Sequence, residues 1–155
     1  MYITTVYSKL SLKQKSKLKK FLLNNFNPDK NKYDLNEMTI IILDIEDNNI
    51  NGCICLYDNS FLLEKINKHN ISKDYYHIEN KSHGCFIYNF CVDKEKRGKK
   101  IGTNLLKYTI DKMKELNIDY LHTHAENEIS ETIFLKNGFM EDKKFDFASL
   151  MIKYI

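Results

Sequence analysis

The sequence predicts one α/β domain, residues 1–155, built on a mixed and mostly antiparallel β-sheet. Three observations lead to this fold class. The chain has 155 residues, the length of one ordinary domain, and 43% of them are hydrophobic, which is typical of a globular protein. Two apolar runs around a short polar turn, 38–45 and 52–57, predict an antiparallel hairpin. The order strand, helix, strand over 85–124 requires a parallel pair joined by a right-handed crossover.

The first half of the chain is expected to mix strands, helices and polar loops. Ser11 is a favourable N-cap for a helix. Four apolar residues at helical spacing would form the buried stripe of that helix: Leu12, Leu18, Phe21 and Leu22. The expected elements outside the hairpin are a strand over 2–7, a helix over 11–25, a polar loop over 24–36 that holds Pro28, a helix over 60–69 and a polar segment over 70–84.

The second half is more regular. The expected elements are a strand over 85–92, a helix over 103–116, a strand over 120–124, a helix over 128–136 and a final strand over 145–154. The apolar stripe of the first of these helices would pack on the sheet and consists of Leu105, Leu106, Ile110, Met113 and Leu116. Asn137 and Gly138 follow the second helix and predict a left-handed cap.

Composition excludes several classes of protein. No apolar run approaches the ~20 residues that span a bilayer, and the first residues lack the features of a secretory signal. We therefore expect a soluble, cytoplasmic protein, either a monomer or a homodimer. The densest basic stretch, 13–20, interleaves lysines with apolar residues at helical spacing, so it indicates a solvated helix face rather than a nucleic-acid-binding surface. Among 24 basic residues the only arginine is Arg97.

The four cysteines indicate reduced, buried thiols. Cys53 and Cys55 would share one face of a strand, and no CxxC pair occurs. A zinc site that combines this pair with His122 and His124 has suitable ligand types, but the spacing matches no standard structural site. We therefore expect no metal, and we expect the thiols to remain reduced.

The segment 92–103 has the pattern of an anion-binding loop. A buried strand ends at Val92, a polar loop with Gly98 and Gly102 follows, and an amphipathic helix begins directly after it. Such a loop presents backbone N–H groups at the positive end of a helix dipole, which suits a phosphate or pyrophosphate. Arg97 would add a charge-assisted donor. Neither a P-loop nor a dinucleotide-binding glycine pattern is present in the sequence.

Two motifs resemble the GNAT superfamily of N-acetyltransferases. The first is the loop Arg97-Gly98-Lys99-Lys100-Ile101-Gly102, which follows Phe90-Cys91-Val92-Asp93 and has Lys100 where the family usually has its middle glycine. The second is Asn127, eleven residues before Gly138, followed by a short helix and the sequence Phe134-Leu135-Lys136-Asn137-Gly138-Phe139. The resemblance is clear over about residues 38–155 and rests on element order alone before that.

This resemblance implies acetyl-CoA as the cofactor. The pyrophosphate of coenzyme A would bind the loop, and the residues implied are Arg97, Gly98, Lys99, Lys100, Ile101, Gly102 and Thr103. The backbone amides of Phe90, Cys91 and Val92 would hold the pantetheine arm and polarise the thioester, where the strand splays at a bulge from its parallel neighbour. Asn127 and Phe134 would contact the pantetheine arm.

The resemblance also implies direct transfer of the acetyl group to a primary amine, for which a base must remove a proton. His122 is our first candidate because a histidine can accept a proton near neutral pH, and Tyr88 is the second. Glu79 and His83 are further alternatives at the same end of the sheet. Many family members protonate the departing thiolate with a tyrosine at the position of Phe134, so this chain would rely on water or another hydroxyl.

The sequence does not identify the amine that accepts the acetyl group. The resemblance implies that the first helix region and the segment 57–84 would build much of its pocket. Asp74, Glu79, Tyr75 and Tyr76 in that segment could attract a cationic amine, or they could form a solvated polar loop. The acceptor would be a small molecule such as a polyamine, a protein N-terminus or a lysine. A non-catalytic acetyl-CoA-binding module of the same fold is the alternative, because Phe134 brings no proton.

Overall fold

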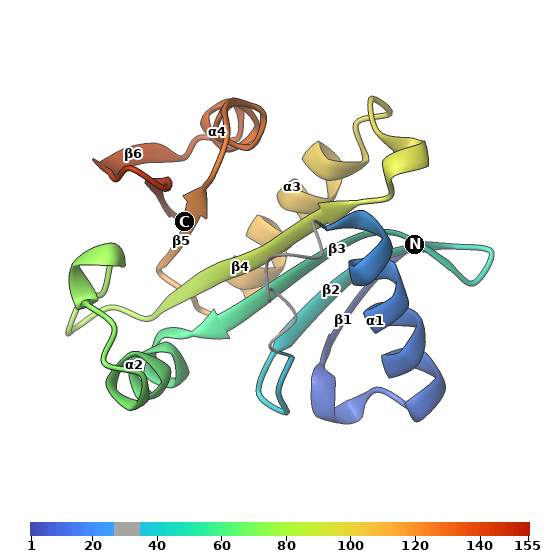
Figure 1. The fold of residues 1–155 in the computed structure, drawn as a ribbon, viewed down its shortest axis with the longest axis horizontal. Coiled ribbons are helices and arrows are strands. Elements are labelled where there is room, and N and C mark those ends of the chain that lie inside the picture. Colours follow the sequence, from blue (N-terminus) through green and yellow to red (C-terminus); the bar gives the residue numbers. More distant parts are fainter. Residues whose placement is uncertain (27–34) are drawn as a thin grey trace. The chain divides into compact units, whose positions relative to one another are not determined.

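The computed structural model describes residues 1–26 and 35–155. Within these residues seven strands form one sheet in the order β1-β2-β3-β4-β5-β7-β6, which confirms the predicted mixed sheet (Figure 1). The chain divides into two compact units. The first unit comprises Met1–Leu56 and Tyr88–Thr109, and the second comprises Tyr57–Ile87 and Ile110–Ile155. The predicted loop around Pro28 lies mostly outside the described residues.

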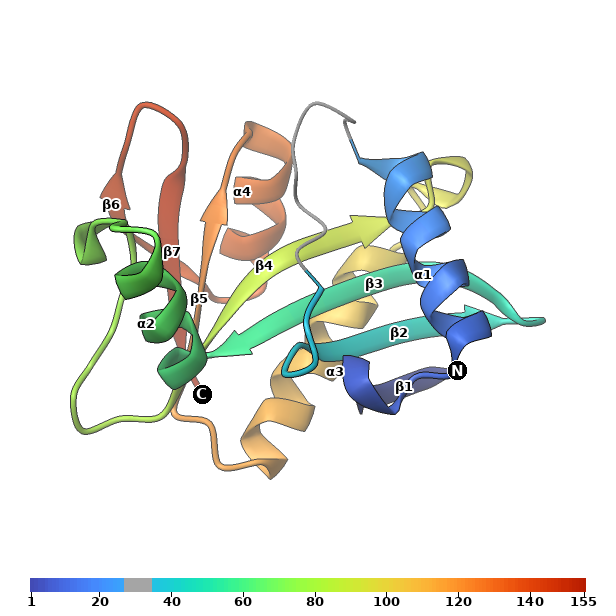
Figure 2. The same ribbon diagram turned by 60° about the horizontal axis from the view of Figure 1, so that its bottom comes forward.

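The first unit contains three antiparallel strands, one covering helix and the loop that leads into a long helix (Figure 2). The elements that lie wholly or partly in it are β1 (Tyr2–Val6), α1 (Leu12–Asn25), β2 (Ile40–Glu46), β3 (Asn49–Asp58), β4 (Gly84–Val92) and α3 (Ile101–Glu115). Short 3₁₀ turns cover Tyr7–Lys9 and Lys94–Lys96.

The β2–β3 hairpin is longer than the sequence predicted. Its turn consists of Asp47 and Asn48 alone, with φ angles of 49° and 63°. Two successive residues at positive φ match a type I′ turn, whose twist suits the two strands and which asparagine and aspartate tolerate. Glu46 therefore pairs with Asn49, and the polar residues that we assigned to a long turn extend both strands.

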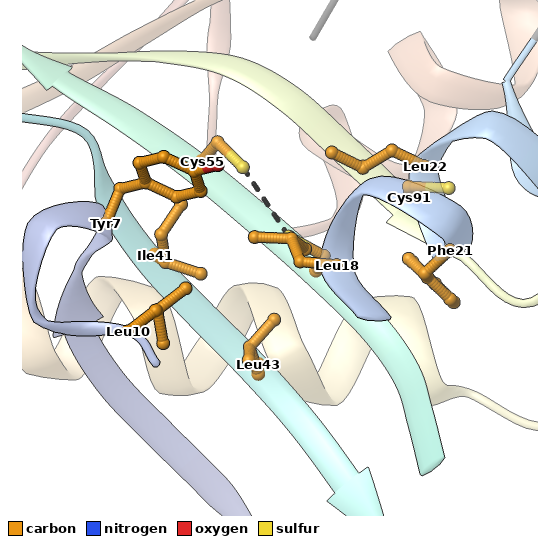
Figure 3. Close-up of a cluster of buried hydrophobic side chains, with 10 residues drawn as sticks. Tyr7, Leu10, Leu18, Phe21, Leu22, Ile41, Leu43, Cys55 and Cys91 are labelled. Atoms are coloured by element: carbon orange, nitrogen blue, oxygen red, sulfur yellow. Dashed lines mark hydrogen bonds between the residues drawn. The ribbon is translucent and has the colours of Figure 1, made fainter. Parts of the chain in front are cut away.

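Helix α1 begins where the sequence predicted. Ser11 and Gln14 form a reciprocal capping box at its N-terminus. Leu18, Phe21 and Leu22 are buried against β2 and β3. Figure 3 shows this apolar cluster, which consists of Tyr7, Leu10, Leu18, Phe21, Leu22, Ile41, Leu43, Cys53, Cys55 and Cys91.

Two residues were wrongly assigned to buried helix stripes. Leu12 is the first residue of α1 and is 86% exposed, and Leu116 follows the last residue of α3 and is 50% exposed. At a helix end the neighbouring turn that would complete the buried stripe is missing, so periodicity alone overestimates burial there.

The second unit has its own helices and the C-terminal strands. Its elements are α2 (Asn59–Lys68), a 3₁₀ turn (Lys73–Tyr75), the start of β4, the end of α3, β5 (Tyr120–Ala125), α4 (Glu128–Lys136), β6 (Met140–Lys144) and β7 (Ser149–Tyr154). The start of β4 pairs with β5 in parallel, from Gly84 opposite Tyr120 to Ile87 opposite Thr123, which confirms the predicted parallel pair.

The C-terminal end of this unit corrects one prediction. The region 145–154 was expected to be a single final strand, but β6 precedes it and pairs antiparallel with β7. All five residues of β6 are exposed, and four of them are charged, so they show no apolar alternation. Such charges are typical of edge strands, where they discourage pairing with other chains. Helix α4 has the predicted bounds, and Gly138 has a φ of +84° in the predicted left-handed cap.

Candidate active site

The loop between β4 and α3 is fixed at its start by backbone contacts within the first unit. Asp93 N–H donates to the Asn51 carbonyl at 2.9 Å, and the Asp93 carboxylate accepts from Glu95 N–H at 3.0 Å. Lys94 N–H donates to Asn25 Oδ1 at 2.8 Å. The loop therefore leaves the sheet in one defined direction before it reaches the predicted pyrophosphate-binding residues.

The backbone of that loop takes the left-handed conformation twice. Gly98 has a φ of +83° and Lys100 has a φ of +61°. A chain that alternates in this way can turn successive N–H groups toward one side and form an anion-binding concavity. The first helical residues, Ile101, Gly102 and Thr103, add N–H groups that have no partner within the helix by virtue of their position. The region can therefore bind a phosphate group through its backbone.

Lys100 stands at a position where a non-glycine residue causes backbone strain. A lysine could stand in for glycine without strain only if φ were negative, and Lys100 has a φ of +61°. A side chain in the left-handed region costs roughly 1 kcal/mol relative to glycine. The loop thus contains a strained residue at Lys100, and the lysine ammonium adds positive charge at the same place.

Gly102 has a different role, which is close packing. A Cβ atom there would lie 3.2 Å from a Val92 methyl carbon and 3.3 Å from the Phe90 ring. A Cβ on Gly98, by contrast, would meet no heavy atom within 4 Å. Gly98 is therefore required for its backbone angle, whereas Gly102 is required for the close approach of α3 to β4.

The end of strand β4 contacts both the apolar cluster and the start of α3. Cys91 belongs to the cluster beneath α1 and Tyr88 packs against it, whereas Phe90 and Val92 lie near Gly102. Exposure alternates along this part of the strand, with Asn89 and Cys91 buried between partly exposed neighbours. The bulge that we expected at the amides of Phe90, Cys91 and Val92 remains a prediction.

Arg97 is exposed, and its Nη2 donates to the Asn25 carbonyl at 3.4 Å. Asn25 is the last residue of α1, and its Nδ2 also donates to the Phe21 carbonyl. It thereby links the end of α1 to both Lys94 and Arg97. Sequence analysis missed Asn25, since one asparagine among many gives no signal until the fold brings it beside the loop.

A cleft of about 780 Å³ lies beside this link in the first unit. It is lined by the end of α1, the β2–β3 turn and the 3₁₀ turn Lys94–Lys96. Lys17, Lys20, Lys94 and Lys96 outnumber its two acidic residues, Asp93 and Glu95. The surroundings of the loop are therefore positively charged, which favours an anionic ligand.

His122 is buried in the second unit, with an exposed fraction of 0%. Its Nδ1 accepts the His77 backbone N–H at 3.3 Å, and its Nε2 lies 2.7 Å from Asn59 Oδ1. This arrangement assigns the proton to Nε2. Burial, with smaller contributions from His77 and His124, lowers the pKa of His122 to about 3. As the side chain lies here, both ring nitrogens are engaged and the imidazole is neutral.

Asn59 and Tyr120 complete a buried polar triad with His122. Asn59 Nδ2 donates to the Tyr120 hydroxyl at 2.7 Å, and Glu79 N–H donates to the same oxygen at 2.9 Å. His122 and Tyr120 therefore each accept a backbone N–H from the segment 77–79 and hold that segment on β5. Sequence analysis did not identify Asn59 or Tyr120, because neither lies in a recognisable motif.

The carboxylate of Glu79 is engaged by hydrogen bonds to Tyr154 and His77. Its Oε1 accepts from the Tyr154 hydroxyl at 2.5 Å and lies 2.8 Å from His77 Nε2. Hydrogen bonds from Tyr154 and then His77 lower the pKa of Glu79 to about 2. His83 pairs instead with Asp58. Neither alternative base contacts His122 through a bond that the structure defines.

The remaining predicted residues divide between the two units. Tyr88 lies in the first unit, with its hydroxyl 3.5 Å from Thr39 Oγ1. In the second unit Asn127 caps α4, because its Oδ1 accepts from Ser130 N–H at 2.9 Å. Phe134 is 2% exposed and packs edge-to-face on Phe139. The contacts of Asn127 and Phe134 with a pantetheine arm remain predictions.

The cysteines are buried, as expected. Cys53 and Cys55 lie with their sulfur atoms 3.5 Å apart, and this hydrogen bond together with burial raises the pKa of the Cys53 thiol well above its usual value. Burial also raises the pKa of Cys85 and of Cys91 to about 12. These three thiols are therefore protonated at neutral pH and are poor nucleophiles and poor metal ligands.

The mixed sheet and the glycine-containing loop before α3 define an α/β protein whose sequence has neither a P-loop nor a dinucleotide-binding glycine pattern. The profile of the acetyltransferase (GNAT) family matches residues 11–139, and the chain belongs to this family. A search of curated protein sequences finds no match. No helix among the described residues is long and apolar enough to cross a membrane.

Solved structures confirm the fold at low sequence identity. The PaiA N-acetyltransferase of Thermoplasma acidophilum, solved with coenzyme A, is 16% identical and has a TM-score of 0.69, with 100% of this chain and 99% of that chain covered. An acyl-CoA N-acyltransferase from Pseudomonas aeruginosa is 13% identical, with a TM-score of 0.74 and coverages of 99% and 98%. The ribosomal-protein-S18-alanine N-acetyltransferase of Escherichia coli is 12% identical, with a TM-score of 0.66 and coverages of 100% and 94%.

Proposed function

We propose that the chain is an N-acetyltransferase that uses acetyl-CoA and acts as one catalytic domain over residues 1–155. The observation that carries this proposal is the backbone of the loop, where Gly98 and Lys100 take positive φ directly before the first turn of α3. The residues present fit a pyrophosphate, because the amides of 98–103 are donors and Arg97, Lys99 and Lys100 supply positive charge.

The second part of the site would lie at the end of β4. A bulge there would leave backbone groups out of the strand ladder, and those of Phe90, Cys91 and Val92 would bind the pantetheine arm and the thioester oxygen. An N–H group aimed at that oxygen would stabilise the negative charge that develops when an amine attacks the carbonyl carbon. Acetyl-CoA supplies the activated acetyl group, and the chain supplies orientation and these donors.

Proton transfer is the least defined step. We keep His122 as the first candidate base and Tyr88 as the second, with a condition on His122. Its Nδ1 can accept a proton from the amine only after the His77 N–H has moved away, and with a pKa of about 3 it would be a weak base. Departing CoA would take its proton from water or from a hydroxyl, since Phe134 has none to give.

A thermal-shift titration tests the cofactor. A ligand that binds only the folded chain raises the melting midpoint as RT ln(1 + [L]/Kd), which is about 2.7 kcal/mol at a hundredfold excess over Kd. Acetyl-CoA should raise the midpoint, adenosine 3′,5′-bisphosphate should raise it less, and ATP should not raise it. An unchanged midpoint at millimolar acetyl-CoA would refute the proposal.

The variant Arg97→Ala tests the loop. We expect its Kd for acetyl-CoA to rise roughly tenfold, in line with the loss of one charge-assisted hydrogen bond. Lys107→Ala is the matched control, because Lys107 is an exposed cation on α3 away from the loop. Equal affinities for both variants would remove Arg97 from the site.

A non-catalytic acetyl-CoA-binding module is the second candidate, supported by Phe134 and by the engaged nitrogens of His122. Release of free CoA separates the two functions. An enzyme releases thiol in an amine-dependent manner, whereas a binding module gives the same thermal shift without turnover.

A further inference from the structure

Aromatic rings gather at the surface of the second unit, where the 3₁₀ turn Lys73–Tyr75 meets the connection between β6 and β7. Phe145 and Phe147 stack with ring centroids 5.5 Å apart and an interplanar angle of 6°. Tyr75 meets both rings edge-on, at 5.3 Å in each case. The His124 ring lies 5.7 Å from that of Phe147. We call these four residues the ring cluster.

Two members of the ring cluster are exposed although they carry large aromatic rings. Phe147 is 52% exposed and Tyr75 is 38% exposed. Behind them Tyr76 and Phe86 pack against His124, each at 5.1 Å, so the exposed rings continue into a buried aromatic layer. Contiguous exposed rings of this kind are characteristic of binding surfaces rather than of inert surface.

Backbone bonds hold the ring cluster in place. Phe145 N–H donates to the Ala148 carbonyl at 2.8 Å, which closes the turn that carries both phenylalanines. His124 Nε2 lies 2.5 Å from the Tyr75 carbonyl, and Tyr76 N–H donates to the Lys73 carbonyl at 3.0 Å. The rings are thus fixed before any ligand arrives, which lowers the entropic cost of binding.

We propose that the ring cluster binds the organic part of the acceptor, and that the acceptor is a primary amine with an aromatic group a short distance from its nitrogen. The proposal rests on the acetyltransferase function. The exposed area amounts to a few rings, which suits one small organic group and falls far short of the ~800 Å² that each partner buries in a standard protein interface. Flat rings attract other rings edge-on or offset, so the ring cluster favours an aromatic group over an alkyl chain.

A carboxylate accompanies the ring cluster. Asp146 lies between the two phenylalanines in the chain and is exposed, so its carboxylate complements a protonated amine.

An amine panel tests the proposal with the full chain and acetyl-CoA. We expect kcat/KM for 2-phenylethylamine to exceed that for putrescine by about tenfold or more. Phe147→Ala should lower kcat/KM for 2-phenylethylamine roughly fivefold to tenfold, because one aromatic pair is lost. The same variant should leave kcat/KM for putrescine and the KM for acetyl-CoA unchanged. A preference for putrescine, or an equal loss with both amines, would overturn the proposal.

Met140→Ala is the matched control. Met140 is 60% exposed on β6, in the same hairpin as Phe147 but outside the ring cluster, so the variant reports any general damage to that hairpin. It should match the unchanged chain with both amines. Tyr75→Ala provides a second test from the other segment and should reproduce the selective loss of Phe147→Ala.

Saturation-transfer NMR with 2-phenylethylamine separates this proposal from the function on which it rests. If acetyl-CoA gives no thermal shift, the acetyltransferase function fails, and amine binding that Phe147→Ala abolishes would still support the ring cluster as an amine site. If acetyl-CoA binds but the amine gives no signal, the ring-cluster proposal alone fails. Concentration-dependent self-association that Phe147→Ala abolishes would instead make the ring cluster a contact between copies and overturn the proposal.

Discussion

Each of the two units is stabilised internally by a different kind of buried group. In the first unit the cluster beneath α1 is made of aliphatic, aromatic and thiol side chains, which need no partners beyond close packing. In the second unit the centre contains His122, Asn59 and Tyr120, which are satisfied by hydrogen bonds to one another and to the segment 77–79. An apolar core is insensitive to pH, whereas a polar core depends on the protonation state of its members.

The largest effect is expected from a substitution that removes side-chain volume from the apolar cluster. Leu22 is 0% exposed, and Leu22→Ala should lower the free energy of unfolding by about 3 kcal/mol through lost burial and a residual cavity. Leu23→Ala is the matched control, because Leu23 is its neighbour and 55% exposed. Urea denaturation at pH 7 and at pH 4.5 should give the same difference for Leu22→Ala. A difference that changes with pH would contradict the contrast between the units.

Acid should act on the second unit through His122. Its pKa is about 3 in the folded chain and about 6.5 when unfolded, so between these values the unfolded chain binds the extra proton. Stability is therefore fully present above about pH 6.5 and falls as the pH decreases toward 3, by about 3 kcal/mol at pH 4. The measurement is the free energy of unfolding from pH 7 to pH 4.

The variant His122→Gln sharpens this test. Glutamine retains a donor for Asn59 but does not titrate, so it should lower stability at pH 7 and remove most of the slope below pH 6.5. His69→Gln, at an exposed position, is the control and should keep the slope. If both variants show the slope of the unchanged chain, His122 does not govern the acid sensitivity of the second unit.

The smallest expected effect concerns the backbone of the loop in the first unit. Lys100 has a φ of +61°, so Lys100→Gly should relieve strain and raise the free energy of unfolding by about 1 kcal/mol. Lys99→Gly is the matched control, and it should not stabilise the chain, because Lys99 is not among the residues with positive φ. Thermal denaturation without ligand distinguishes the two variants. Destabilisation by Lys100→Gly would mean that the ammonium contributes more than the strain costs.

Local signals in the sequence predicted the elements that depend on neighbouring residues. Ser11 and Gln14 form the cap of α1, Gly138 ends α4 in the left-handed conformation, and the strand–helix–strand order gave the parallel pair. The strand β6 could not be predicted, because its five exposed residues carry no apolar pattern. The cap, the chain reversal and the crossover are decided by bonds and sterics over a few residues, so the sequence shows them directly.

The candidate site was predicted only in part, for a physical reason. The loop from Arg97 to Gly102 could be recognised because consecutive residues form it. The environment of His122 could not, because its low pKa arises from burial, with smaller contributions from His77 and His124. Its hydrogen-bond partners, His77 and Asn59, are 45 and 63 residues away in the chain. The same holds for Asn25 at the loop and for the ring cluster. The sequence by itself determined the family, the loop and most elements, whereas tertiary structure decided which polar groups are buried together, because desolvation depends on neighbours that chain order does not reveal.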